Sequence, residues 1–205
     1  MDILSRRSLI KLNAAGIVLA VTGRAFASPF AGMPSSSPSS ALMSRARAAL
    51  AQHQGRLPHS DRIGIADFSR PSHAPRFFIV DMSSGQSSAH LVSHGRGSDP
   101  AHTGWVKSFS NESGSFASSS GAYATGETYI GGHGRSMRLA GLDATNSNAE
   151  SRAIVVHAAW YVSPDMARNT GKLGRSEGCF AVSSESLETV LGQLGPGRLL
   201  YADKA

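Results

Sequence analysis

The chain has 205 residues, the length of a single domain, and 40% of them are hydrophobic, which is enough for a sizeable core. It has 22 glycines and a net charge of +6, but no base-stacking or phosphate-binding motif accompanies the basic residues. The composition therefore disfavours a helix bundle and a nucleic-acid-binding protein. It suits a mildly basic domain that works against a polyanionic wall or membrane surface.

Residues 1–27 are typical of an export signal. An arginine pair in residues 5–12 (SRRSLIKL) precedes an apolar run that is shorter than the ~20 residues needed to span a bilayer. Residues 25–27 (AFA) then supply the small side chains that signal peptidase requires at its −3 and −1 positions, Ala25 and Ala27. The arginine pair resembles a twin-arginine signal, with an ordinary secretory signal as the alternative. We expect a precursor that uses the twin-arginine export machinery. The expected product is a periplasmic or otherwise extracytoplasmic protein of net charge +3, with no transmembrane segment.

The segment after the signal divides into a linker and a helix. Residues 28–40 (SPFAGMPSSSPSS) have no apolar period and predict a Pro/Ser linker. Residues 40–54 repeat apolar side chains at helical spacing, with Ser40 as the expected N-cap. Residues 41–61 therefore hold an N-terminal helix and its connection. We expect this helix to pack on the surface of the domain formed by residues 62–205.

From residue 62 onward, short apolar runs between turns predict strands. The stretch 95–122 is rich in Gly, Ser and Asn, and its three aromatic residues predict an ordered loop that packs on the core. A second helix is expected at residues 183–195, capped by one of the two serines at its start. The pattern predicts a mainly β fold, a sandwich or closed barrel, with one or two flanking helices. The expected strands are residues 62–68, 76–82, 86–94, 123–132, 136–141, 151–162 and 197–203.

Cys179 is the only cysteine of the chain and lies in residues 174–183 (GRSEGCFAVS). An exported chain with one cysteine has no intramolecular disulfide, so the thiol is either a buried, inert side chain or a nucleophile. The neighbouring residues favour a nucleophile. Gly178 lets the backbone turn tightly, so that the N–H groups of Gly178 and Cys179 can face one developing oxyanion. Ser176 can fix this turn through a local hydrogen bond.

A cysteine nucleophile needs a base, and the chain has eight histidines. His94, His133 and His157 stand out because each ends a strand or opens a Gly-rich turn. Three histidines also suit a zinc site, but none has the short HxH or HxxxH spacing of metal ligands, so we predict no metal. His157 is the best base. It follows the most apolar strand, which would hold the ring rigidly, and it precedes Cys179 by 22 residues.

The order of a histidine, a short loop and Ser-x-Gly-Cys resembles the L,D-transpeptidases of the YkuD type, which crosslink peptidoglycan. Their motif is a histidine, a loop of similar length and (S/T)HGC. The resemblance spans about residues 62–200, is strongest to a secreted branch of the family, and implies the fold of that family. The segments that carry it upstream of the cysteine are HGRGSD (94–99), FSN (109–111), GSFASSSGAY (114–123), YATGETYIGGHG (123–134), HGRSMRLAGLDATN (133–146) and RAIVVHAAWYVS (152–163).

The resemblance implies a role for each residue that matches the motif. Cys179 is the expected nucleophile and His157 its base, with the ring oriented by the backbone carbonyl of Ala158. The N–H groups of Gly178 and Cys179, together with that of Glu177, are the expected oxyanion hole. No cofactor and no metal is implied.

The chain also departs from the family motif at two places. Glu177 replaces the histidine of (S/T)HGC, and residues 180–182 (FAV) lack the arginine or asparagine that often follows the cysteine. These positions help to shape the substrate pocket in better-known members, so other residues are expected to bind substrate. The candidates are His133, Ser176, Arg175 and Arg135, with Arg96 and Arg138 as further anion partners.

The resemblance implies acyl transfer between peptidoglycan stem peptides. The cysteine attacks the bond between diaminopimelate and D-Ala in a tetrapeptide stem, and the thioester passes to an amine of a second stem to give a 3→3 crosslink. If water takes the place of the amine, the protein is an L,D-carboxypeptidase, a hydrolase with the same nucleophile. A non-catalytic wall-binding protein of the same fold and a cysteine hydrolase of unrelated fold remain as alternatives.

Overall fold

The computed structural model describes residues 37–205, so the predicted export signal (1–27) and most of the predicted linker (28–40) lie outside the described residues. The first helix, α1, spans Ser40–Gln52. The predicted N-cap, Ser40, is wrong by one residue, because the N-cap is Ser39. Ser39 is extended (φ −61°, ψ 147°), and its side chain accepts a hydrogen bond from the N–H of Leu42 at 3.2 Å. Both serines suit a cap chemically, and the apolar period does not distinguish neighbouring positions.

Eight strands within the described residues form one sheet in the order β3-β2-β1-β8-β4-β5-β6-β7. Neighbouring strands are antiparallel, except that β1 pairs with β8 and β6 pairs with β7 in parallel. The strands are β1 (Arg62–Asp67), β2 (Phe77–Asp81), β3 (Ser87–His90), β4 (Gly121–Gly131), β5 (Gly134–Gly141), β6 (Val155–Ala158), β7 (Phe180–Val182) and β8 (Leu199–Asp203).

The chain that follows β3 joins the two edges of this sheet. Val92 forms an isolated bridge with Val182 of β7, and the N–H of Ser93 donates to the carbonyl of Ala181 at 2.9 Å. These contacts bring the sheet round into a barrel-like ring and occupy backbone groups that an open edge would leave unpaired. The predicted mainly β fold, a sandwich or closed barrel with flanking helices, is confirmed.

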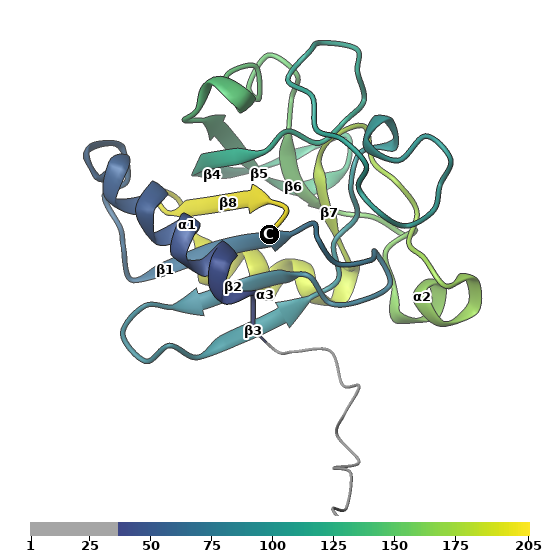
Figure 1. Ribbon diagram of the computed structural model, residues 1–205, viewed down its shortest axis with the longest axis horizontal. Helices are drawn as coiled ribbons and strands as arrows, with labels where there is room; N and C mark the ends of the chain where they lie inside the picture. Colours follow the sequence, from purple (N-terminus) through teal and green to yellow (C-terminus); the bar gives the residue numbers. More distant parts are fainter. Residues whose placement is uncertain (1–36) are drawn as a thin grey trace, which may run out of the picture. The chain divides into compact units, whose positions relative to one another are not determined.

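The helices α1 and α3 pack on opposite faces of β1, as Figure 1 shows. Ile63 and Ile65 of β1 lie in one hydrophobic cluster with α1. Gly64, between them, points to the other face, where a Cβ would lie 3.1 Å from Leu194 of α3. The helix α3 spans Ser184–Leu194 and is capped by Ser183, one of the two serines predicted for that role. Because side chains alternate along a strand, β1 contributes to both layers of the core.

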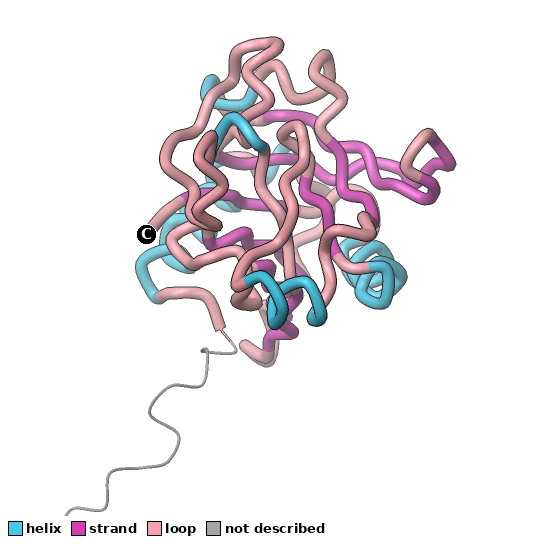
Figure 2. Tube along the Cα trace, turned by 90° about the vertical axis from the view of Figure 1, so that its right-hand side faces the viewer, coloured by secondary structure: helices cyan, strands magenta, loops and turns pink. Residues whose placement is uncertain are grey.

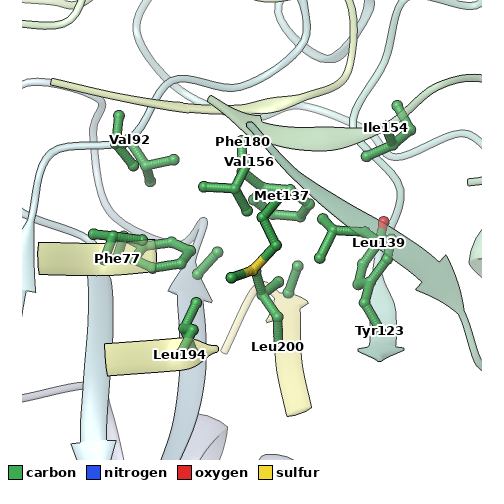
Figure 3. Close-up of a cluster of buried hydrophobic side chains, with 14 of the residues drawn as sticks. Phe77, Val92, Tyr123, Met137, Leu139, Ile154, Val156, Phe180, Leu194 and Leu200 are labelled. Atoms are coloured by element: carbon green, nitrogen blue, oxygen red, sulfur yellow. The ribbon is translucent and has the colours of Figure 1, made fainter. Parts of the chain in front are cut away.

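The larger hydrophobic core lies between the sheet and α3 (Figure 3). It includes Met137 of β5, Val156 of β6, Phe180 of β7 and Leu194 of α3, each fully or almost fully buried. Burial of one such side chain contributes about 1.5–3 kcal/mol to stability. Val156 immediately precedes His157 and Phe180 immediately follows Cys179, so this core fixes the strand ends that carry both predicted catalytic residues.

A third helix, α2 (Pro164–Thr170), was not predicted from the sequence. Ser163 caps it through the N–H of Met166, Pro164 takes its first turn, and Gly171 ends it with a left-handed backbone (φ 69°). Within residues 37–205, neither α2 nor any other helix is long and apolar enough to cross a membrane.

Loops, drawn in pink in Figure 2, make up much of the side of the molecule that faces the viewer. In the loop-rich stretch 95–122, Val106 is buried and Phe109 packs against the larger core. Phe109 thus makes the predicted contact of the loop with the core, whereas Trp105 and Phe116 are 44% and 39% exposed. Polar contacts anchor the loop as well. The N–H of Ser118 donates to Ser98 Oγ at 3.0 Å, within the buried part of the protein.

Candidate active site

Cys179 and His157 lie on neighbouring segments of the chain, at the parallel strands β7 and β6. His157 belongs to β6 and pairs in register with Ala181 of β7, and Val156 pairs with Phe180. Cys179 directly precedes β7 and is two residues from Ala181. The parallel register brings Cys179 to the level of the residues just before His157 on β6, where the N–H of Val155 faces its thiol.

The His157 ring, the predicted base, is buried and neutral. It is 3% exposed, and its Nδ1 lies 2.8 Å from the carbonyl oxygen of Ala158. A carbonyl only accepts hydrogen bonds, so Nδ1 carries the proton and Nε2 keeps a lone pair. Burial lowers the pKa of His157, the bond to Ala158 opposes this, and the nearby His133 lowers it further. The net result is a ring that is uncharged at neutral pH.

The resting thiol of Cys179 points toward the chain before β6. Its sulfur lies 3.5 Å from the carbonyl oxygen of Ala153, and no hydrogen bond of residues 37–205 joins it to His157. Ala153 has a left-handed backbone (φ 52°), which is uncommon for a residue with a Cβ and places strain beside the predicted nucleophile. Burial raises the pKa of the thiol. The N–H of Val155 and the charge of Arg152 lower it, but the net shift is upward, so the resting group is a thiol.

The turn before Cys179 is fixed by Ser176. The hydroxyl of Ser176 donates to the carbonyl of Cys179 at 2.7 Å and accepts from the N–H of Gly178 at 3.2 Å. Gly178 has φ +119°, and a Cβ there would lie 2.7 Å from Ile154 Cδ1 and 2.8 Å from the carbonyl oxygen of Ala117. Only glycine fits this position. Of the predicted oxyanion donors, the N–H of Gly178 is thus occupied in this state by Ser176.

The same turn is held from behind by residues 94–96. The N–H of Ser176 donates to the carbonyl of His94 at 2.9 Å, and the N–H of Arg96 donates to the carbonyl of Ser176 at 2.8 Å. The His94 side chain is fully buried, with Nδ1 2.7 Å from Arg76 Nη2 and Nε2 3.4 Å from Asp99 Oδ2. His94 therefore supports the turn. Within residues 37–205, no group of three or more His, Cys, Asp or Glu side chains is placed to hold a metal ion.

His133 is the predicted substrate-binding residue that comes nearest to the base. It lies at the tip of the hairpin β4–β5, and its ring stacks on that of His157 with centroids 4.3 Å apart and planes 20° from parallel. This hairpin projects from the body of the molecule in Figure 2. Arg135, next along the hairpin, forms an ion pair with Glu188 of α3, which directs its charge toward the helix.

Of the remaining predicted arginines, two lie beside the turn that carries Cys179 and one lies on the hairpin β4–β5. Arg96 reaches Glu177 with Nη2 2.9 Å from Oε1, and Arg175 donates to the carbonyls of Asp99 and Pro100. Both border the turn that carries Cys179. Arg138 instead lies over the ring of Tyr129, 4.3 Å from its centroid.

Arg152 was missed by the sequence analysis. Its Nη1 donates to the carbonyl of Ser110 at 2.8 Å and to Ser119 Oγ at 2.9 Å, and its Nη2 donates to the carbonyl of Ala117. The guanidinium thus ties the long loop to the site, and its charge lowers the pKa of Cys179. All three acceptors belong to the long loop and two of them are backbone carbonyls, so no side-chain motif in the sequence marks the contact.

The family model that describes the L,D-transpeptidase catalytic domain matches residues 34–202. Similar solved structures include an L,D-transpeptidase from Mycobacterium tuberculosis H37Rv, at 15% identity and a TM-score of 0.44, which covers 70% of this chain and 58% of that chain. L,D-transpeptidase 3 from Mycobacterium tuberculosis in complex with a faropenem-derived adduct has 14% identity, a TM-score of 0.46 and coverage of 70% and 60%.

The helical cell shape determining protein Pgp2 from Campylobacter jejuni has 12% identity, a TM-score of 0.44 and coverage of 78% of this chain and 54% of that chain. The chain thus spans roughly three fifths of the length of the first two solved structures. No curated protein sequence matches the chain.

Proposed function

Because the chain belongs to the L,D-transpeptidase catalytic domain family, we propose that it is a cysteine-dependent L,D-transpeptidase that acts on peptidoglycan stem peptides outside the cytoplasm. The observation that supports this most is the parallel pairing of β6 with β7, which brings His157 and the residue that precedes β7, Cys179, to neighbouring positions. The contact of His157 Nδ1 with the carbonyl of Ala158 adds to it, because it leaves Nε2 available as a base.

In the first half-reaction the thiol leaves the carbonyl of Ala153 and turns toward His157. Nε2 takes the thiol proton, and the sulfur attacks the carbonyl carbon of diaminopimelate in a tetrapeptide stem. The oxyanion that forms is stabilised by the N–H groups of Cys179 and Gly178, the latter released from Ser176. The C–N bond to D-Ala then breaks, D-Ala leaves with the proton from His157, and a thioester remains.

In the second half-reaction an amine of a neighbouring stem attacks the thioester. His157 takes a proton from the amine, the new amide bond forms, and the C–S bond breaks. The sulfur recovers the proton from His157, which returns the site to its resting state with a 3→3 crosslink as product. If water attacks instead, the products are a tripeptide stem and the free thiol, which is the outcome of an L,D-carboxypeptidase.

The proposal is tested by incubating the protein with a tetrapeptide dimer and following products and intact protein by mass spectrometry. We expect D-Ala release, an acyl adduct on Cys179 and a crosslinked product. A trimmed tripeptide without crosslinks assigns the carboxypeptidase. Cys179→Ala should abolish all three signals, and turnover that persists in this variant removes Cys179 from the mechanism. A protein that binds sacculi but forms no adduct, even with a carbapenem, is a wall-binding protein.

A further inference from the structure

Glu177 and Arg96 form an ion pair beside the nucleophile. Arg96 Nη2 lies 2.9 Å from Glu177 Oε1, and the two side chains are 49% and 66% exposed. Arg96 is held in place from two directions, because its N–H donates to the carbonyl of Ser176 and its guanidinium lies 3.9 Å from the centroid of the Phe116 ring. Glu177 is two residues from Cys179, a distance of at most about 7 Å along the backbone.

Two surface hollows adjoin this pair. One has a volume of about 270 Å³ and is lined by Arg96, Gly97, Pro100, Phe116 and Arg175. The other has a volume of about 200 Å³ and is lined by Ser113, Gly114, Phe116, Ser151, Arg152 and Glu177. Phe116 borders both. The first hollow is therefore cationic with an apolar wall, and the second contains the single carboxylate of the turn.

The pair contributes little to the stability of the fold. An ion pair between exposed side chains is worth about 0–1 kcal/mol. Arg96 and Glu177 can therefore separate and bind a ligand instead, with little loss of folding free energy. Three guanidinium groups (Arg96, Arg152 and Arg175) and one carboxylate surround the two hollows, so a ligand that carries both an anion and a cation fits better than an ammonium alone.

We propose that Arg96 and Glu177 form a subsite for a zwitterionic amino-acid head, and that it takes the side-chain end of diaminopimelate in the donor stem. This inference rests on the proposed function. The side chain of diaminopimelate ends in a carbon that carries both a carboxylate and an ammonium group, three methylenes from the reacting centre. The carboxylate pairs with Arg96, the ammonium with Glu177, and the methylenes lie near Phe116.

The two charges of the ligand predict two independent effects on the enzyme. Arg96→Gln removes the partner of the carboxylate, and Glu177→Gln removes the partner of the ammonium. A stem with the side-chain carboxylate converted to an amide no longer needs Arg96, and a stem with the side-chain amine acetylated no longer needs Glu177. Arg96→Gln should therefore slow the acetylated stem but not the amidated stem, and Glu177→Gln should slow the amidated stem relative to the acetylated stem.

The experiment measures the single-turnover rate of D-Ala release from the unmodified, amidated and acetylated tetrapeptide stems. Arg96→Gln should slow the unmodified and acetylated stems about tenfold and leave the amidated stem unchanged, the effect of one hydrogen bond between charged partners. Glu177→Gln should slow the unmodified and amidated stems to a similar degree relative to the acetylated stem, whose rate reports the separate effect of the Glu177 charge on the pKa of the Cys179 thiol. Arg168→Gln, in the exposed pair with Asp165 on α2, is the matched control and should change none of the three rates.

Two results would overturn the subsite. In one, the wild-type protein releases D-Ala from all three stems at one rate. In the other, Arg96→Gln slows all three stems equally, as a purely structural role for Arg96 requires. If the wild-type protein releases D-Ala from no stem and forms no carbapenem adduct, the proposed function itself fails, and the subsite inference fails with it.

Discussion

His133 and His157 stack face to face, with ring centroids 4.3 Å apart and an angle of 20° between the planes. His133 comes from the turn between β4 and β5 and His157 from β6, and the two meet because Ser136 of β5, three residues after His133, pairs with His157. At this distance a proton on one ring opposes a proton on the other. The stack therefore helps to keep His157 neutral, which a base for the thiol requires.

The first prediction concerns the pH dependence of D-Ala release. The pKa of His157 is lowered by burial and by His133, so the base is lost only when the pH falls below the ordinary histidine value of about 6.5. The acid limb of the rate should therefore have its midpoint below pH 6.5. His133→Phe keeps an aromatic ring on His157 but removes the charge, and it should move the midpoint upward. The measurement is a pH–rate profile of both proteins at saturating substrate.

His133→Ala serves as the companion variant, because it removes both the charge and the cover over His157. Its midpoint should lie at least as high as that of His133→Phe. If both variants keep the wild-type midpoint, His133 does not influence the base.

A related prediction concerns the base itself. His157→Ala should lower the alkylation rate of Cys179 near neutral pH. Equal labelling of the wild-type protein and the His157→Ala variant would show that His157 does not activate the thiol.

The second prediction concerns Arg152 and thiol reactivity. Its positive charge lowers the pKa of Cys179 against the effect of burial. Arg152→Met should therefore slow alkylation of Cys179 several-fold at a fixed pH, because less thiolate is present. Arg152→Lys keeps the charge and should retain more of the rate. Iodoacetamide labelling between pH 7 and 9, read as intact mass, measures the effect, and Arg168→Met is the matched control. Equal labelling of the Met and Lys variants would contradict the electrostatic role.

The third prediction concerns Gly178. An alanine there would be forced into φ +119° with its Cβ within 3 Å of Ile154 Cδ1 and of the Ala117 carbonyl oxygen. Gly178→Ala should destabilise the fold by about 1–3 kcal/mol and displace the thiol, so activity should be lost even in the folded fraction. Gly192→Ala is the matched control, because nothing lies within 4 Å of a Cβ at this position on α3. That change should stabilise the protein by about 0.5–1 kcal/mol in urea unfolding. Full activity in Gly178→Ala would contradict the packing argument.

The strands and helices that the sequence predicts are those with a long apolar period. Residues 62–68 and 197–203 are predicted as strands and correspond to β1 and β8. The strand predicted at 151–162 is only Val155–Ala158, because the residues before and after it turn. The three-residue strand β7 and the seven-residue helix α2 are too short to show a repeat of apolar residues in the sequence. The caps of α2 were nevertheless readable as Ser163, Pro164 and Gly171.

The residues of the candidate site also fall into those that the sequence predicts and those that it misses. Cys179, His157 and Ser176 were found from sequence because one short motif and one strand end carry them. Arg152 was not found, since its contacts are with loop carbonyls and a loop serine whose positions depend on the tertiary fold. The pairing of Arg96 with Glu177 joins residues 81 positions apart, and it follows only from the bridge between residues 95 and 176. The sequence thus predicts the chemistry of the candidate site, and the tertiary contacts define its electrostatic surroundings.

The last prediction concerns His94 and the acid stability of the fold. His94 is fully buried between Arg76 and Asp99, and burial together with the charge of Arg76 lowers its pKa to about 3. In the unfolded chain the same ring takes up a proton near pH 6.5. Between these two values the unfolded state binds more protons, so stability falls as the pH falls below 6.5, by at most about 1.4 kcal/mol per pH unit. His94→Gln cannot titrate and should lose this part of the slope, although it also lowers stability at pH 7. Urea unfolding at pH 7, 6 and 5 measures both proteins, and identical slopes would show that His94 does not set the acid limit.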